Sequence, residues 1–218
     1  MKKIFFPSVF ATLAVLSFCI VPAFPEDLRA IRLLKPQIGK GVPLMQALKD
    51  RSSSRSFSSE KLSVQALSNL LWAAFGVNRP ETGKRTAPSA MNRQEIEIYV
   101  VTAKGTWLYD AKAQSLKPVA AGDLRSLAGT QEWVKDAPLN LVYVADTARM
   151  DGDNDKAKTL YSGADTGFIA QNVYLYCASE GLGTVVRASV DRPALAKALG
   201  LRPEQRIILA QTVGYPKD

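Results

Sequence analysis

The stretch from Ala164 to Ser189, ADTGFIAQNVYLYCASEGLGTVVRAS, changes from a helical pattern to a strand pattern. Gly181 is placed to end the helix as a C′ residue, and the β-branched run from Thr184 to Val186 favours a strand. The helical part carries apolar side chains on several sides, which is typical of a buried helix: Phe168, Ile169, Val173, Leu175, Tyr176 and Cys177. Taken alone, this stretch is equally typical of a core helix and strand with no direct role in function.

The composition favours one domain and excludes several classes of enzyme. The chain has 218 residues, of which 47% are hydrophobic, enough for one core. It contains no histidine. Hydrolases that use Ser-His-Asp or Cys-His groups, and most zinc enzymes, are therefore excluded. Any catalysis has to come from carboxylates, lysine, tyrosine or a bound cofactor.

The N-terminus has the pattern of a secretory signal. Lys2 and Lys3 precede an apolar run, and the small residues around Ala23 that follow it are typical of a cleavage site. We expect a signal peptide over residues 1–23 and a mature domain over residues 24–218, exported to the periplasm or secreted. Loss of the two lysines changes the formal net charge from +8 to +6. An uncleaved anchor is the alternative, and after cleavage no stable membrane span is expected.

The mature chain would keep a single cysteine, Cys177, because Cys19 lies in the signal. This excludes an intrachain disulfide and indicates a buried thiol that fills space in the core. Asp151, Asp153 and Asp155 resemble the start of a calcium loop. The sixth position of that loop is Lys156 rather than glycine, so we do not expect a metal there.

Periodicity predicts the remaining elements. Ser63 and Asp191 are typical N-caps, and the half-buried strand at 96–100 alternates apolar with polar residues. Expected helices lie at 26–35, from 44, at 64–75 and at 193–199; expected strands lie at 96–100, 106–109, 115–119, 138–145 and 206–213.

Two polar stretches suggest a ligand site. Residues 51–57, RSSSRSF, place two arginines around serine hydroxyls, a combination that suits a phosphate and other oxygen-rich groups. The alternative is a solvated serine-rich loop. Residues 88–94, PSAMNRQ, come just before a strand, where polar side chains can hydrogen-bond a planar ligand at the end of a sheet. We call these stretches the first motif and the second motif.

In this order, the two motifs and the stretch from Ala170 to Ser189, with the ending VGYP at 213–216, resemble the FMN-dependent nitroreductase family. Within this family, residues 85–89, RTAPS, are most similar to the azoline-oxidase branch. The resemblance implies an α+β fold with a central, mostly antiparallel sheet flanked by helices. It also implies an intertwined homodimer with two FMN sites at the interface.

Carried over by position, the resemblance implies a set of FMN contacts. The first motif would contact the phosphate, the ribityl chain and the N1/O2 side of the ring. The second motif of the other subunit would contact the ring and the ribityl groups. In the stretch from Ala170 to Ser189, a backbone N–H just after the predicted strand would face flavin N5. The residues are Arg51, Ser52, Ser53, Arg55, Pro88, Ser89, Asn92, Ala188 and Ser189.

The sequence departs from the family pattern in two places. Relatives often have glycine where Ala188 stands, and basic residues after the final strand, where only Lys217 remains. Arg85 and Arg187 are candidates to compensate for the missing phosphate contacts.

The function implied is an FMN-dependent oxidoreductase. Hydride would pass through flavin N5 in a ping-pong cycle, from NAD(P)H or another donor to a small nitro- or quinone-like acceptor, with no metal and no nucleic acid involved. The main alternative is an exported flavin-binding protein without turnover. A basic protein that binds nucleic acid or an anionic surface is disfavoured, because lysines and arginines are scattered along the chain.

Overall fold

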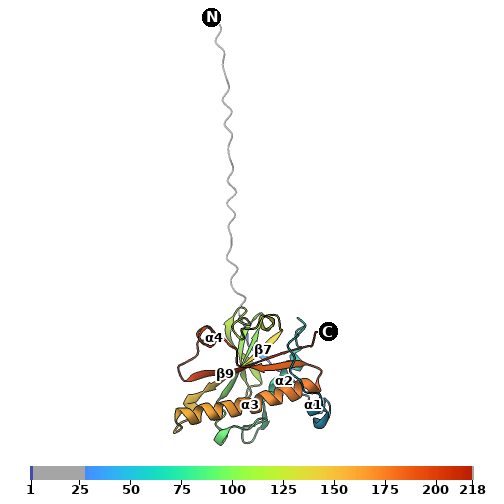
Figure 1. Ribbon diagram of the computed structural model, residues 1–218, viewed down its shortest axis with the longest axis vertical. Helices are drawn as coiled ribbons and strands as arrows, with labels where there is room; N and C mark the ends of the chain where they lie inside the picture. The colour runs from blue at the N-terminus through green and yellow to red at the C-terminus, as the bar shows by residue number, and fades with distance from the viewer. Residues whose placement is uncertain (2–27, 218) are drawn as a thin grey trace.

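The computed structural model describes Met1 and residues 28–217, which form one central sheet with helices on both faces (Figure 1). Apart from Met1, the predicted signal peptide lies outside the described residues. Within those residues, no helix is both long enough and apolar enough to cross a membrane.

The main sheet has seven strands in the order β1-β6-β5-β4-β7-β9-β8, and every neighbouring pair is antiparallel. A separate two-stranded sheet precedes the second motif. The strands are β1 Ile31–Arg32, β2 Val77–Arg79, β3 Lys84–Arg85, β4 Ile96–Thr102, β5 Gly105–Asp110, β6 Ser115–Ala121, β7 Leu139–Asp146, β8 Gly183–Arg187 and β9 Gln205–Gly214. This arrangement confirms the predicted α+β class and the antiparallel sheet.

The helices form a layer on each face of the sheet. Side chains of α2 and α3 share a core with one face of β4 and β7, and in Figure 1 α3 runs below β9 in nearly the same direction. Leu195 and Leu199 of α4 pack with the opposite face. The helices are α1 Leu44–Asp50, α2 Val64–Phe75, α3 Asp155–Ser179 and α4 Arg192–Leu199, with short 3-10 turns η1 Ala90–Asn92, η2 Glu132–Val134 and η3 Thr147–Arg149.

Side-chain caps fix the starts of two helices as the sequence predicted. The Ser63 hydroxyl accepts a hydrogen bond from the backbone N–H of Ala66, and Asp191 accepts one from that of Ala194. Such caps satisfy N–H groups that a helix cannot satisfy internally.

The long helix α3 begins earlier than the sequence suggested and is exposed along one side. Its N-cap is Asn154, and Gly181 follows its end in a left-handed conformation, with φ of 69°. Ile169, Val173 and the thiol of Cys177 are buried, as predicted. However, Phe168 is 47% exposed, and Leu160, which precedes the predicted stretch, is 67% exposed, so the predicted burial of this helix holds on one side only.

Two other expectations were wrong for reasons of tertiary structure. Residues 28–35 do not form a helix: Ile31 pairs with Leu116 at the edge of the sheet, and this pairing outweighs the local helical pattern. The strand β4 is not half-buried. Tyr99 and Val101 are also buried, because α4 and the 124–127 turn cover the second face.

Candidate functional site

The first motif lies between the end of α1 and the edge strand β8. The Arg51 guanidinium lies over the ring of Tyr174 in α3, 5.3 Å from its centroid. Further along, the backbone N–H of Ser54 donates to the carbonyl of Thr184 at 3.0 Å. A Cβ at Gly183 would come within 2.9 Å of the Ser54 Cβ, so this close approach needs glycine in β8.

Tyr174 joins the first motif to the sheet, a role that sequence reasoning missed. Its hydroxyl is 2.9 Å from Ser53 Oγ and accepts a hydrogen bond from the backbone N–H of Val186 at 3.0 Å. The sequence did contain one signal for this role, a tyrosine within an apolar helix. A buried phenol needs a polar partner for its hydroxyl.

The first motif presents charge that is not neutralised nearby. Ser52, Ser53 and Arg55 are exposed, and Arg51 is half-buried. Among the described residues, neither arginine has a carboxylate within 4.0 Å. Two guanidinium groups, with exposed serines between them, are therefore available to contact an anion.

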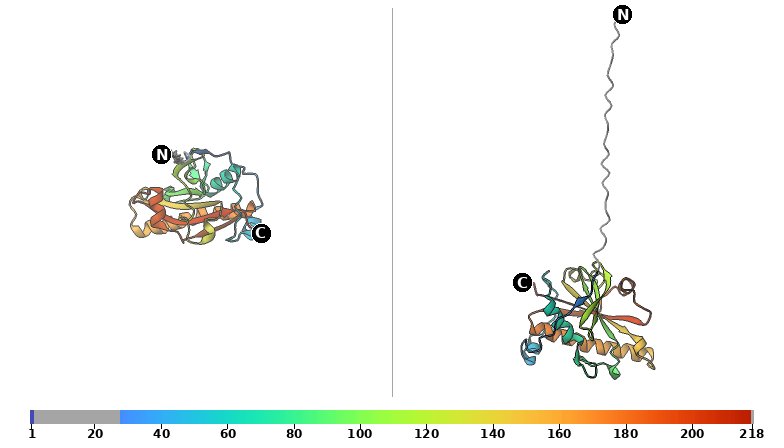
Figure 2. Two further views of the ribbon diagram at one scale, coloured as in Figure 1. Left: turned by 90° about the horizontal axis from the view of Figure 1, so that it is seen from above. Right: turned by 180° about the vertical axis from the view of Figure 1, so that it is seen from behind.

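The C-terminal segment returns to the first motif. Phe57 forms a β-bridge with Pro216, and the backbone N–H of Lys217 donates to the carbonyl of Ser56 at 3.3 Å. Both views in Figure 2 show the C-terminus on the same side of the molecule as α1. The fold thus brings Lys217, the one basic residue left after the last strand, to the predicted phosphate-binding stretch.

The second motif is a tight turn with an unusual backbone. Met91, Asn92 and Gln94 have φ of 51°, 55° and 51°, values that non-glycine residues seldom adopt. The backbone N–H of Ala90 donates to Asp165 Oδ2 in α3 at 2.9 Å, and that of Gln94 donates to Ser89 Oγ at 2.9 Å. Strained turns of this kind persist only where surrounding contacts fix them, and they cluster at functional sites.

The side chain of Gln94 is the centre of those contacts. It accepts from Arg85 Nε at 2.8 Å and donates to the carbonyl of Gly83 and to Asn92 Oδ1, both at 3.1 Å. Arg149 Nη1 donates to the Gln94 carbonyl at 2.9 Å. This network holds the Asn92 side chain in place from within the same chain.

Arg85 and Arg187 are both engaged inside the protein. Arg85 lies over the ring of Phe75, 4.8 Å from its centroid, and donates to the carbonyl of that residue. Arg187 is buried beneath Trp133 and donates to Asn140 Oδ1 at 2.7 Å; burial lowers the pKa of its guanidinium to about 10. These contacts are all made within one chain, and a role of either arginine in replacing the missing phosphate contacts stays a prediction.

Ala188 and Ser189 follow the end of β8, where the resemblance predicts the contact to flavin N5. Ala188 is exposed, and its carbonyl accepts from Arg192 Nη1 at 2.9 Å. The Ser189 hydroxyl accepts from Gln131 Nε2 at 2.5 Å. These contacts fix the backbone at the end of the strand.

Within one chain the two motifs do not meet. The first motif contacts α3 at Tyr174, whereas the second contacts it at Asp165. These positions are separated by about 13 Å along the helix, at about 1.5 Å per residue.

A pair of carboxyl groups lies behind the second motif. Glu95 is fully buried, and neither of its carboxyl oxygens has a hydrogen-bond partner among the described residues; Asp165 is also buried. Burial raises the pKa of Glu95 to about 7, and the negative charge of Asp165 adds to this effect, while Arg93 opposes it. The Glu95 carboxyl is therefore largely protonated in mildly acidic solution.

Comparison with known proteins identifies the family to which this fold and these motifs belong. The model of the nitroreductase family matches residues 48–215, a span that includes both motifs, β8 and the whole of β9. This chain belongs to the nitroreductase family. Family membership supports a flavin-type oxidoreductase and confirms the resemblance seen in the sequence.

Individual relatives agree with this assignment. A nitroreductase-family protein of Methanocaldococcus jannaschii is 33% identical over 157 residues, covering 66% of this chain and 77% of the relative. A crystal structure of a nitroreductase-family protein from Ralstonia eutropha is 43% identical, with a TM-score of 0.84 and coverage of 88% of this chain and 91% of that one.

The microcin synthetase complex McbBCD of E. coli contains a chain with the same fold. It is 21% identical, with a TM-score of 0.67 and coverage of 95% of this chain and 85% of that one. Identity this low shows the fold alone, so the leaning toward the azoline-oxidase branch stays a prediction.

Proposed function

We propose that the protein is an FMN-dependent oxidoreductase whose flavin is held by the first motif of one subunit and the second motif of another. The observation that carries this proposal is the pair Arg51 and Arg55, which lack carboxylate partners among the described residues and flank exposed serine hydroxyls. An anion with further oxygen acceptors fits this arrangement.

A terminal phosphate favours FMN over FAD. The first motif follows a helix as a serine-rich loop and contains no glycine-rich dinucleotide fingerprint of the kind that binds a pyrophosphate. Lys217, carried to Ser56 by the C-terminal segment, adds one positive charge on the same side.

The flavin would supply the hydride chemistry through N5, which is consistent with a chain that lacks histidine. The protein residues bind and orient. We assign Arg51 to the phosphate and Arg55 to the N1/O2 side of the ring, where negative charge develops on reduction. The backbone at Ala188 and Ser189 would orient N5, and Ser52 and Ser53 would hold ribityl oxygens. In the resulting ping-pong cycle, NAD(P)H or another donor reduces the cofactor, and a small nitro- or quinone-like acceptor reoxidises it.

A second copy of the chain completes the site in this proposal. Pro88, Ser89 and Asn92 do not reach the first motif of their own chain. The outer face of α3 leaves Leu160 and Phe168 exposed, and α1 leaves Leu44 and Met45 exposed, so apolar surface is available for a homodimer. Sedimentation analysis that finds only monomers at micromolar concentration would contradict this arrangement.

We expect the purified protein to be yellow and to release FMN on heating. Chromatography of the released cofactor checks its identity, and FAD, or no flavin even after reconstitution, would contradict the assignment. Anaerobic titration with NADH and then NADPH should bleach the flavin absorbance. Binding of FMN without bleaching by either nucleotide, or by another donor, would favour the alternative of a flavin-binding protein without turnover.

Export remains part of the proposal and rests on the N-terminal sequence alone. N-terminal sequencing of protein recovered from the periplasm or the medium should find a start near Phe24. A full-length chain found in the cytosol would contradict export and leave the enzymatic proposal intact.

A further inference from the structure

Arg187, the last residue of β8, is a buried arginine whose charge is not balanced. It is 8% exposed, and no carboxylate lies within 4.0 Å of it among residues 28–217. Burial alone lowers the pKa of its guanidinium to about 10, so the group is still charged at neutral pH. A buried charge without a partner is strongly unfavourable for folding, so its presence calls for a reason outside stability.

The guanidinium is also short of hydrogen-bond partners. Nη2 donates to Asn140 Oδ1 at 2.7 Å, whereas Nε and Nη1 are buried and have no partner among the described residues. The group is enclosed by the Trp133 ring, whose centroid is 5.8 Å from Cζ, and by Gly129, where a Cβ would come within 2.8 Å of Nε. A ligand cannot reach these nitrogens, so an effect of Arg187 on a ligand has to act through space.

The side chains around Arg187 contact both ends of the proposed flavin site within one chain. The Trp133 ring packs against Phe57 of the first motif, with the ring centroids 5.7 Å apart. Gln131, which precedes the same turn η2, donates to the Ser189 hydroxyl at 2.5 Å. The positive charge therefore lies in a cluster that supports both the predicted phosphate-binding stretch and the backbone predicted to face flavin N5.

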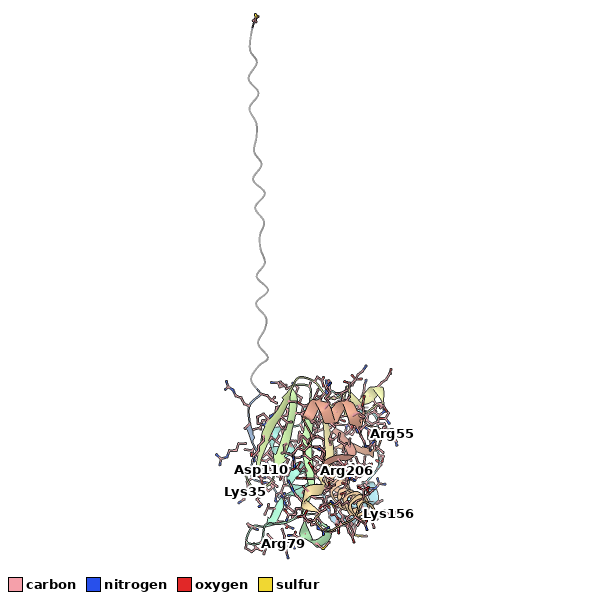
Figure 3. The ribbon with its side chains drawn as sticks, turned by 90° about the vertical axis from the view of Figure 1, so that its left-hand side faces the viewer. Lys35, Arg55, Arg79, Asp110, Lys156 and Arg206 are labelled. Carbon is pink, nitrogen blue, oxygen red and sulfur yellow. The ribbon has the colours of Figure 1, made fainter. Side chains whose placement is uncertain are left out.

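We propose that Arg187 acts on the cofactor without touching it: its buried charge stabilises reduced flavin relative to oxidised flavin and so raises the reduction potential. This inference rests on the proposed function, because it requires bound FMN. The oxidised ring is neutral and reduction adds negative charge, so a fixed cation nearby favours the reduced form. Water screens Arg187 less than Arg55, which is exposed and lies at the edge of the molecule in Figure 3.

Arg187→Met tests this role, because methionine is a flexible apolar residue that can fill the space without the charge. Relative to oxidised FMN, the variant should bind reduced FMN about tenfold more weakly than wild type does, a fall of about 30 mV in the two-electron potential. Potentiometry of the purified full-length protein with a reference dye measures the fall. It should persist at about 1 M salt, which screens an exposed charge but not a buried one. The Tm of the apoprotein should not decrease, because an unpaired buried charge has been removed.

Three further variants separate charge from structure. Arg187→Lys keeps the charge without the forked shape and should stay close to the wild-type potential. Asn140→Asp keeps the oxygen that accepts from Arg187 and adds a carboxylate that balances the charge, so it should lower the potential as Arg187→Met does. Arg32→Met removes an exposed arginine at the opposite edge of the sheet and should leave the potential unchanged.

The outcomes distinguish this inference from the proposed function. Equal potentials in wild type and Arg187→Met would overturn the role of Arg187 and leave the FMN-dependent oxidoreductase intact. A potential of Arg187→Lys as low as that of Arg187→Met would also overturn it, because the shape of the side chain and not its charge would then be responsible. Wild-type protein that binds no FMN, even after reconstitution, would overturn both.

Discussion

Replacing Arg51 with alanine is expected to weaken FMN binding by about ten- to a hundredfold, because a charge-assisted contact to phosphate contributes about 1.5–3 kcal/mol. The ring of Tyr174 lies beneath the guanidinium and orients it, and no carboxylate among the described residues competes for it. Fluorescence titration of the apoprotein with FMN measures this loss.

Arg55→Ala is expected to act differently. Arg55 is exposed, and we place it near N1 and O2, where its charge would stabilise the reduced, anionic cofactor. Its loss should lower the two-electron reduction potential by about 30 mV for each 1.4 kcal/mol of lost stabilisation, with a smaller effect on affinity. Potentiometry with a reference dye measures the shift.

Arg32→Ala is a matched control, since Arg32 is exposed in β1, at the opposite edge of the sheet from β8. It should change neither FMN affinity nor the potential. If Arg51→Ala and Arg55→Ala both behave like this control, the first motif does not bind the flavin.

The sequence was sufficient to predict most of the sheet and the position of the second motif at its end. Alternating or continuous apolar runs predicted β4, β7 and β9, because a strand buried against a helix layer needs such patterns. The β-branched run from Thr184 to Val186 predicted β8, and β5 and β6 were predicted as a hairpin. The edge strand β1 was missed. It is two residues long, and its partner residue Leu116 is far away in the sequence. Local periodicity therefore does not indicate this strand.

The candidate site was predictable in its residue types but not in its supporting contacts. The arginines and serines of the first motif stand together in the chain, whereas Tyr174, which joins Ser53 to Val186, is distant in sequence. Arg85 seemed a candidate for the phosphate because it is basic. The fold places it over Phe75 and against Gln94, a supporting contact that depends on where α2 ends and that the local sequence does not reveal.

The buried carboxyl of Glu95 is expected to make the stability of the protein depend on pH. Its pKa is about 7 in the folded state, compared with about 4.5 as an ordinary glutamate. Between these values the folded state holds a proton that the unfolded state has released. Stability from this group is therefore fully present below about pH 4.5, falls as the pH rises toward 7, and is lost above about pH 7.

Glu95→Gln should remove this dependence, because glutamine keeps the shape of the protonated acid and does not ionise. Relative to wild type, the free energy of unfolding of the variant should increase by about 2–4 kcal/mol between pH 4 and pH 8. Urea denaturation at several pH values measures this difference. Glu60→Gln, at an exposed carboxyl, should follow the wild-type curve.

Parallel curves for wild type and Glu95→Gln would show that Glu95 is ionised in the folded protein at neutral pH, which its burial beside Asp165 argues against. The outcome also bears on the second motif. Asp165 accepts the backbone N–H of Ala90, and Glu95 directly follows Gln94. Ionisation of Glu95 above pH 7 would put a second negative charge behind a strained turn, so loss of stability there should be accompanied by weaker FMN binding in wild type and not in Glu95→Gln.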